Sequence, residues 1–484
     1  MKIQNQKLFQ NKCYIDGNWI DSNNKQTIAV NNPASLEIIG NVPKCGTDET
    51  KLAIEAANNA LPDWKAKTAK ERSILLRKWF DLIILNQEDL ANIMTIEQGK
   101  PINESRGEIG YGASFIELYA EEGKRVYGET IPDTLPDRRI VVIKQPIGVV
   151  AAITPWNFPS SMITRKCAPA LAVGCPVVIK PASQTPYSAL ALGVLAEEAG
   201  FPKGVINILT GSAKEIGSEL TSNPNVRKVS FTGSTEVGKI LLAQCASTVK
   251  KVSMELGGHA PFIAFDDCDV NQAVLGAMQS KFRNTGQTCV CANRLFVHDK
   301  IYDEFLDKFT KQVKNIKVGN GLDENVTSGP LIDQYSLKKV QEHVQDAVNI
   351  GSKIAVGGDI HSLGGNFYQP TILYNVTSKA KITYQETFGP VASIIRISDL
   401  DEAIDIINAS NFRLAGAIST TSRDSAVRLH DSIQVGQFSW NGPPGYRTEE
   451  APFGGFGDSG NGEKEGVVMM TRAMRRIRTV YEHI

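Results

Sequence analysis

The sequence of 484 residues has no excess of either charge, because 52 lysines and arginines balance 52 aspartates and glutamates. Proteins whose main partner is a nucleic acid or an anionic membrane usually carry a basic excess. The chain also has no uninterrupted apolar run near the ~18 residues that span a bilayer. We therefore expect neither nucleic acid nor a membrane as a partner.

Cysteine is scarce as well, with eight in the whole chain, and the segment Met1–Leu8 lacks the apolar core of a secretion signal. Without such a signal, so few cysteines in a long chain do not indicate a disulfide framework. These absences predict a reducing, cytoplasmic setting.

The remaining composition is ordinary for a soluble globular protein, with 42% hydrophobic and 21% charged residues. The sequence contains no internal repeat and no low-complexity tract. A chain of this length exceeds one ordinary hydrophobic core, so two or three domains are predicted.

Short apolar strands begin to alternate with helices near residue 147, after a segment, 48–122, with mainly helical spacing. This alternation predicts right-handed crossovers and a parallel sheet, which binds ligands at the carboxyl ends of its strands. The predicted strands are 148–153, 176–180, 205–209, 228–232 and 252–255, and the predicted helices are 161–173, 188–199, 214–221 and 235–246.

A second α/β segment extends from about residue 260 to 465. In two further segments, 138–143 and 473–481, β-branched and charged residues alternate. That alternation is typical of exposed strands, and we expect both segments to be edge strands that pair with another subunit. The predicted strands of the second α/β segment are 261–265, 294–297, 392–397 and 415–419.

Cys289 lies in a loop rich in Gly, Asn and Thr, where a ligand can reach a thiol. Glu255 ends a predicted strand and opens onto Gly257 and Gly258. A nucleophile and a base that meet across a cleft indicate covalent catalysis. The alternative for Cys289 alone is a small buried hydrophobic side chain. Because no Cys or His pair with zinc-site spacing stands near Cys289 and Cys291, no metal is expected.

Three segments at strand ends have residue types that suit a dinucleotide or an oxyanion. Gly233 and Ser234 open a helix whose N-terminus favours a phosphate, although the spacing also fits a plain strand-to-helix turn. Lys180 and Ser183 stand where NAD sites place a carboxylate, which favours NADP, and a solvated lysine is the alternative. The Asn157 amide can donate to an oxyanion or simply belong to a turn.

Seven segments together resemble the signature segments of the aldehyde dehydrogenase superfamily, in the family's order. A narrower resemblance, to the NADP-dependent succinate-semialdehyde dehydrogenases, is carried by Met162–Lys166 and Phe282–Ala292. The seven segments are Pro155–Pro159, Lys180–Ser183, Phe231–Gly238, Glu255–Gly258, Gly286–Cys289, Glu386–Pro390 and Pro452–Gly455.

The resemblance implies an α/β fold with two Rossmann-like α/β domains and a small β arm for oligomerisation. Residues 1–123 and 146–256 would form the dinucleotide-binding domain, and residues 257–465 the catalytic domain. Residues 124–145 and 466–484 would form the arm and join the chain into a homodimer or homotetramer.

The resemblance also implies roles for the candidate residues. Cys289 would attack the aldehyde carbon as a thiolate, and the Asn157 amide would bind the oxyanion with the Cys289 backbone N–H. Glu255 would activate the water that hydrolyses the thioester. The implied cofactor is NADP, with NAD as the alternative, and its implied binding residues are Trp156, Lys180, Ser183, Gly233, Ser234, Leu256, Glu386 and Phe388.

Arg165 and Arg283 are implied to bind the distal carboxylate of a semialdehyde, because a planar guanidinium suits a carboxylate. The implied substrate is succinate semialdehyde. Glutarate semialdehyde, 2-oxoglutarate semialdehyde and aldehydes without a carboxylate are alternatives. Residues 440–451 depart from the pattern of the succinate-semialdehyde enzymes, since they contain no serine to bind the carboxylate. Arg447 or Tyr446 are the candidates to take the place of that serine.

Two rival readings are disfavoured by the same residues. A relative that transfers the acyl group to CoA generally lacks the base Glu255, and a non-catalytic protein would not need Cys289 and Asn157. The resemblance also suggests a reversible disulfide between Cys289 and Cys291 as a redox switch, and the alternative is that Cys291 is a spectator thiol.

Overall fold

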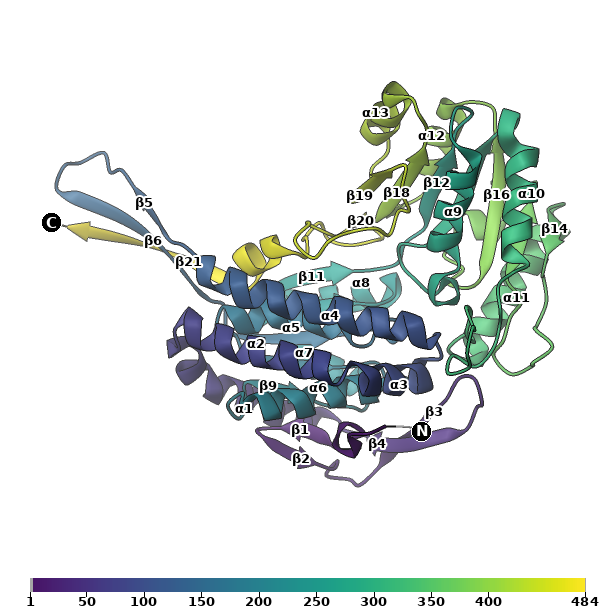
Figure 1. Cartoon of the computed structure of the whole chain (residues 1–484). Coiled ribbons are helices and arrows are strands. Elements are labelled where there is room, and N and C mark those ends of the chain that lie inside the picture. The colour runs from purple at the N-terminus through teal and green to yellow at the C-terminus, as the bar shows by residue number, and fades with distance from the viewer. Residues whose placement is uncertain (1–2, 484) are drawn as a thin grey trace.

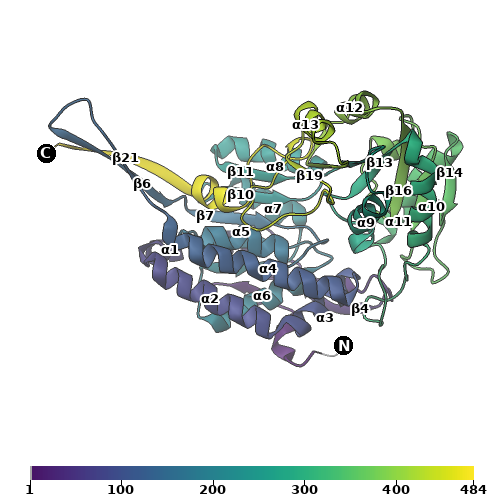
Figure 2. The same cartoon turned by 45° about the horizontal axis from the view of Figure 1, so that its top comes forward.

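Two seven-stranded sheets and a three-stranded arm form the framework of the part of the chain that the structure, a computed structural model, describes: residues 3–483 (Figure 1). Figure 2 shows the same arrangement after a turn, with the two sheets in separate bodies and the arm extending away from both.

The first sheet has five parallel strands and two antiparallel strands at one edge, in the order β11-β10-β7-β8-β9-β1-β2. The parallel strands are almost wholly buried, as is usual where helices cover both faces of a sheet. In this order the strands are Lys251–Glu255, Val226–Thr232, Val149–Ile153, Val177–Lys180, Ile206–Ile208, Cys13–Ile15 and Asn18–Ile20.

The predicted strands of this sheet are confirmed as β7 to β11, with ends that differ by at most two residues. β10 begins at Val226, two residues earlier than predicted, because its register with β7 shifts between Val226 and Lys228. Such an irregularity lets a strand continue past an extra residue. β1 and β2, which the sequence analysis does not predict, extend the sheet through β9.

Helices α1 to α8 pack around the first sheet. α1 to α4 confirm the helical prediction for residues 48–122, and α5 to α8 confirm the predicted helices 161–173, 188–199, 214–221 and 235–246. α2 begins with a capping box, in which Thr68 and Glu71 each accept the other's backbone N–H. No helix within residues 3–483 is both long and apolar enough to cross a membrane. The helices are Thr47–Ala66, Ala69–Leu85, Gln87–Gln98, Ile102–Glu122, Ser161–Ala172, Pro186–Ala199, Ala213–Ser222 and Thr235–Cys245.

The second sheet is parallel except for its edge strand β14, and its order is β14-β15-β16-β13-β12-β18-β19. The four strands predicted for this segment are confirmed as β12, β13, β16 and β18. In sheet order the strands are Lys353–Val356, Thr371–Tyr374, Val391–Ile397, Ala292–His298, Ala260–Ala264, Ala415–Ser419 and Gln437–Trp440, and the helices α9 to α13 are Val270–Lys281, Tyr302–Val313, Gln334–Asn349, Leu400–Asn408 and Arg423–Ser432.

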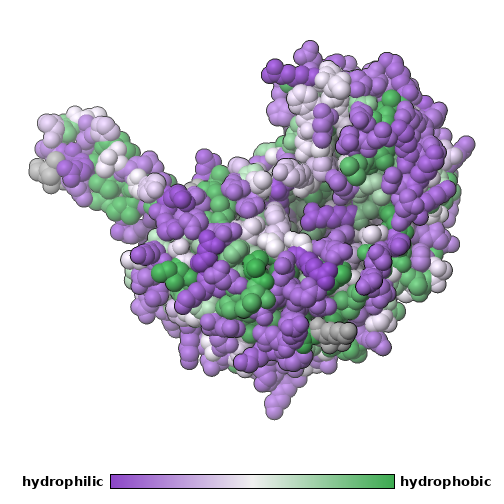
Figure 3. All heavy atoms as spheres, viewed as in Figure 1, coloured by the Kyte–Doolittle hydropathy of each residue, from purple (hydrophilic) through white to green (hydrophobic). Residues whose placement is uncertain are grey.

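The arm consists of β5 (Glu129–Ile131), β6 (Arg138–Pro146) and β21 (Arg475–His483). β6 pairs with β21 along its whole length and with β5 on its other side. The prediction that residues 138–143 form an edge strand is therefore wrong, because β5 and β21 occupy both edges of β6. Figure 3 shows apolar side chains on the projecting arm, where Ile143, Ile477 and Tyr481 are exposed.

Two short pairs complete the strands. β3 (Thr27–Asn31) and β4 (Ile38–Pro43) form a hairpin near the N-terminus. β17 (Phe412–Arg413) pairs with β20 (Phe456–Gly457). The second pair ties the segment after β19 to the second sheet.

A buried ion pair fixes the loop after β7 to the helices that cover the sheet. Lys100 follows α3 and its Nζ lies 2.5 Å from Glu108 Oε2 in α4, and both side chains are 1% exposed. Glu108 Oε1 accepts the backbone N–H groups of Ser160 and Ser161 at the start of α5. Lys100 Nζ also donates to the carbonyl oxygen of Asn157. The pair therefore holds the backbone at Asn157 in one position.

We expect Glu108→Ala to lower the free energy of unfolding by about 3–5 kcal/mol, because Lys100 would stay buried without its counter-ion. Glu117→Ala is the matched control on the same helix, since Glu117 pairs with Arg77 in solvent, where an ion pair contributes only about 0–1 kcal/mol. Urea unfolding measures both variants, and equal small losses would contradict the expectation.

Candidate active site

The loop that carries Cys289 has an unusual backbone. Asn284 and Thr285 have φ angles of 48° and 57°, in the left-handed region that non-glycine residues rarely adopt. The buried Gln287 side chain holds the loop, because its amide donates to Asn284 O and its oxygen accepts from Ile332 N. The backbone before the thiol is therefore fixed by its surroundings.

Gly258 brings the end of β11 against this loop. A Cβ at Gly258 would lie 1.9 Å from the carbonyl oxygen of Cys289, so only glycine allows this approach. The Gly258 N–H donates to Glu386 Oε1 at 2.9 Å. The thiol loop, the turn after Glu255 and Glu386 thus meet at one point between the two sheets.

Asn157 lies beside the same loop and is buried. Its Nδ2 donates to Gln287 O at 3.0 Å, two residues before Cys289. Its own carbonyl oxygen accepts from Lys100 Nζ and from Asn284 Nδ2. Folding therefore brings the predicted oxyanion donor next to the backbone of the predicted nucleophile.

Glu255, the last residue of β11, is 4% exposed, and among residues 3–483 neither of its carboxyl oxygens has a hydrogen-bond partner. Burial raises the pKa of Glu255 to about 8, the charge of Glu465 adds to this shift, and Arg165 and Lys166 oppose it. A buried carboxyl group with a pKa near neutrality has the properties of a general base.

The Cys289 thiol is partly exposed and reduced. Burial raises its pKa to about 11, the positive charge of Arg447 lowers it, and the carboxyl groups of Glu386 and Glu255 raise it. The thiolate is the reactive form, so nearby cations favour reaction and nearby carboxylates oppose it.

A cavity of about 330 Å³ lies on one side of Cys289. Trp156 and Phe388 meet edge to face in its wall, with ring centroids 5.5 Å apart. Burial raises the pKa of Glu386 in this wall to about 7. The structure thus brings together most of the residues predicted for the cofactor, namely Trp156, Gly233, Ser234, Leu256, Glu386 and Phe388.

Lys180 and Ser183 do not line this cavity, although they follow β8 at the same end of the sheet. Lys180 is buried and its Nζ donates to Pro181 O. Burial lowers the pKa of Lys180 to about 8, and no carboxylate offsets this shift. A buried ammonium group without a counter-ion fits an anionic ligand such as a phosphate.

A second cavity, of about 360 Å³, lies on the other side of Cys289. Two guanidinium groups reach it. The exposed Arg283 lies 5.1 Å from the Phe158 ring, and Arg447 Nε donates to the Tyr111 hydroxyl at 2.8 Å.

Arg165 was predicted to join Arg283 at the substrate, but it does not line this cavity. Its guanidinium is buried and forms an ion pair with Glu465, which also pairs with Lys166 at 2.8 Å. The structure places Arg447, from the segment that departs from the family pattern, at the cavity instead.

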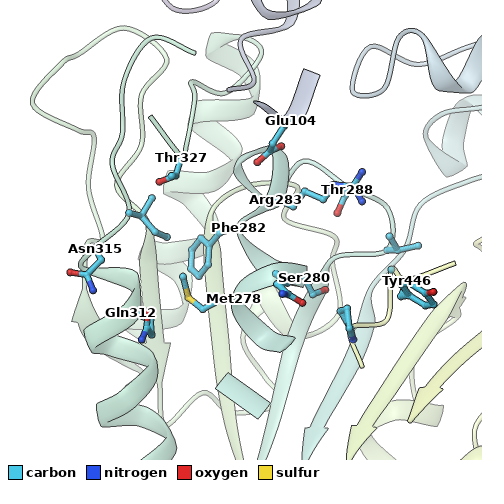
Figure 4. Close-up of a pocket in the computed structure, with 15 residues that line it drawn as sticks. Glu104, Met278, Ser280, Phe282, Arg283, Thr288, Gln312, Asn315, Thr327 and Tyr446 are labelled. Atoms are coloured by element: carbon cyan, nitrogen blue, oxygen red, sulfur yellow. The ribbon is translucent and has the colours of Figure 1, made fainter. Parts of the chain in front are cut away.

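A wider cavity of about 640 Å³ adjoins the second one. The two share the lining residues Glu104, Arg283, Thr288, Val290, Gly445 and Tyr446. Figure 4 shows Tyr446 on one side of this outer cavity and Gln312 and Asn315 on the other. Arg283 therefore stands between the outer and the inner cavity, whereas Arg447 lines only the inner one.

Cys291 is buried, and its sulfur lies 3.3 Å from Lys281 Nζ, which also donates to Asn293 Oδ1. The disulfide between Cys289 and Cys291 stays a prediction, since both thiols are free here. In the described part of the chain, no group of three or more His, Cys, Asp or Glu side chains is placed to hold a metal ion.

Sequence reasoning missed two residues that shape the site, Tyr111 and Glu465. Tyr111 lies in α4, 336 residues before its partner Arg447, and Glu465 lies 299 residues after Lys166. Neither stands in a short motif, so no local signal in the sequence identifies them.

Known proteins similar to this chain belong to the family that its sequence segments resemble. The family model described as "Aldehyde dehydrogenase family" matches residues 19–480. The chain is 57% identical to glutarate-semialdehyde dehydrogenase of Pseudomonas aeruginosa and 54% identical to succinate-semialdehyde dehydrogenase [NADP(+)] GabD of Escherichia coli, over 96% of each chain. A crystal structure of an E. coli NADP-dependent enzyme superposes with a TM-score of 0.98 at 52% identity over the full length of both chains.

We expect the alkylation of Cys289 by iodoacetamide to accelerate about tenfold per pH unit from about pH 7 to pH 10, because the reactive thiolate is scarce below the thiol pKa of about 11. Mass spectrometry of the modified peptide measures the rate, with the partly exposed Cys268 as an internal comparison. A rate that levels off below about pH 9 would contradict the raised pKa.

Proposed function

Because the chain belongs to the aldehyde dehydrogenase family, we propose that it oxidises a semialdehyde to a dicarboxylic acid with NADP. Succinate semialdehyde is the proposed substrate, and glutarate semialdehyde is the alternative, since the relatives compared above are named for these two substrates. The observation that carries the proposal is the position of Cys289 between a cavity with dinucleotide features and a cavity with two guanidinium groups.

In the first half of the reaction the Cys289 thiol releases its proton to solvent. The thiolate sulfur then forms a bond to the aldehyde carbon, and the carbonyl π electrons move to the oxygen. The Asn157 amide, which donates to Gln287 O in this structure and lines the same cavity as Cys289, is proposed to turn toward that oxyanion together with the Cys289 N–H. Loss of hydride from the same carbon leaves a thioester on Cys289. Sulfur suits both steps, because it attacks readily and leaves a thioester readily.

In the second half Glu255 takes a proton from water, and the resulting hydroxide attacks the thioester. The carbon–sulfur bond breaks, the dicarboxylic acid leaves and Cys289 returns as a thiolate. The raised pKa of Glu255 makes it a stronger base than an exposed glutamate, at the cost of being protonated below about pH 8.

NADP would supply the hydride acceptor. Its nicotinamide end is proposed to lie in the cavity lined by Trp156, Leu256 and Glu386, where the Glu386 carboxylate would accept hydrogen bonds from the ribose hydroxyls. Its pyrophosphate is proposed to lie near Gly233 and Ser234, where α8 begins. Lys180 is the proposed partner of the 2′-phosphate, supported by its burial without a counter-ion, and Ser183 follows it in sequence.

The arm is proposed to join this chain to further copies of itself, as a homodimer or homotetramer. Ile143, Ile477 and Tyr481 expose apolar area on the arm, which a partner would cover. The outer edge of β21 has no partner strand among residues 3–483 and is open to pairing. The cytoplasmic setting stays a prediction from the sequence.

Initial rates followed at 340 nm test the proposal. We expect kcat/KM to be highest for succinate or glutarate semialdehyde with NADP, because only these substrates pair their distal carboxylate with a guanidinium. Butanal, which lacks the carboxylate, is the matched control, and each substrate is measured with NADP and with NAD. Equal turnover of butanal would contradict a semialdehyde substrate, and a preference for NAD would contradict the role of Lys180.

We expect Glu255→Gln to lower kcat by about 10²–10⁴-fold, because hydrolysis of the thioester loses its base. The first turnover should persist as a burst of NADPH followed by a slow steady state. In the wild type, kcat should rise with pH through about 8, as Glu255 loses its proton. Loss of the burst together with the steady state would place Glu255 in the first half of the reaction.

A further inference from the structure

The Arg447 guanidinium is only partly satisfied by the protein. Its Nε donates to the Tyr111 hydroxyl, but its Nη1 is buried and has no hydrogen-bond partner among residues 3–483. The Tyr111 hydroxyl accepts this bond and keeps its own proton to donate. Both residues line the inner cavity beside Cys289, so an oxyanion there would meet a hydroxyl donor and a positive charge.

The charges around this cavity are unbalanced. Arg447, Arg165 and Lys166 lie together, and Glu465 is the carboxylate that pairs with two of them. Glu255, the next carboxyl group, is neutral below about pH 8. An excess of buried positive charge is unfavourable unless an anionic ligand offsets it.

Phe453 contacts both arginines. Its ring centroid lies 3.7 Å from the Arg447 guanidinium carbon and 5.2 Å from that of Arg165. The ring thus stabilises both cations. Arg165 forms an ion pair with Glu465, whereas Arg447 forms none within residues 3–483.

We propose that Arg447, assisted by the Tyr111 hydroxyl, binds the distal carboxylate of the substrate, and that Arg165 instead serves as the counter-ion of Glu465. This inference rests on the proposed semialdehyde oxidation. Arg283, which is exposed and lies where the outer and inner cavities meet, contacts the substrate at the entrance. Arg447 thereby replaces the serine that the sequence pattern leads one to expect in the 440–451 segment.

The test compares kcat/KM for succinate semialdehyde and for butanal in the wild type, Arg447→Gln, Arg447→Lys and Arg165→Gln. We expect Arg447→Gln to lower kcat/KM for succinate semialdehyde about 10- to 100-fold more than kcat/KM for butanal. The change should come mainly from a higher KM, because a charge-assisted bond to the carboxylate is lost. Arg447→Lys should restore part of this difference, since it keeps the charge. Arg165→Gln should lower kcat/KM for both substrates by a similar factor, since it removes the counter-ion of Glu465 and does not touch the substrate carboxylate.

Equal decreases of kcat/KM for both substrates in Arg447→Gln would overturn the inference. A decrease specific to succinate semialdehyde that appears only in Arg165→Gln would overturn it as well. If Arg447→Gln does not fold, the lysine variant decides, because unchanged discrimination between the two substrates in Arg447→Lys contradicts a contact of the substrate carboxylate with the Arg447 guanidinium. A wild type that turns over both aldehydes equally would instead contradict the proposed function, which separates the two failures.

Discussion

The buried ion pair between Lys100 and Glu108 is the contact on which the geometry of the site depends. It joins α3 and α4 to the first turn of α5 and to the backbone of Asn157. A pair of this kind adds little net stability, since the desolvation of both charges offsets their attraction. Its effect is on geometry, because only one arrangement of these elements satisfies both buried charges.

The sequence predicts the two parallel sheets well because their strands are short β-branched runs between helices, a pattern set by local chemistry. It also predicts Cys289, Glu255 and Asn157, each of which stands in a short segment with its own chemical logic. For Arg165 the sequence identifies the residue type but not its counter-ion, which is Glu465. Glu465 reaches that arginine only after the chain has folded.

Local sequence patterns do not identify residues whose partners are distant in the chain, because only folding brings such partners together. Tyr111 and Arg447 come from α4 and from the loop after β19, and only the packing of the two sheets brings them together. The arm illustrates the point for strands. The alternation in 138–143 identifies a strand, but whether it lies at an edge or in the centre depends on β5 and on β21.

The arm also sets a condition on how the chain is made. β6 leaves the ribosome roughly 330 residues before β21, its main pairing partner. At bacterial or eukaryotic synthesis rates this interval is on the order of tens of seconds. During that time a nine-residue strand with the run Ile140–Ile143, all isoleucine and valine, has an unpaired edge, a feature that favours association with the edges of other chains.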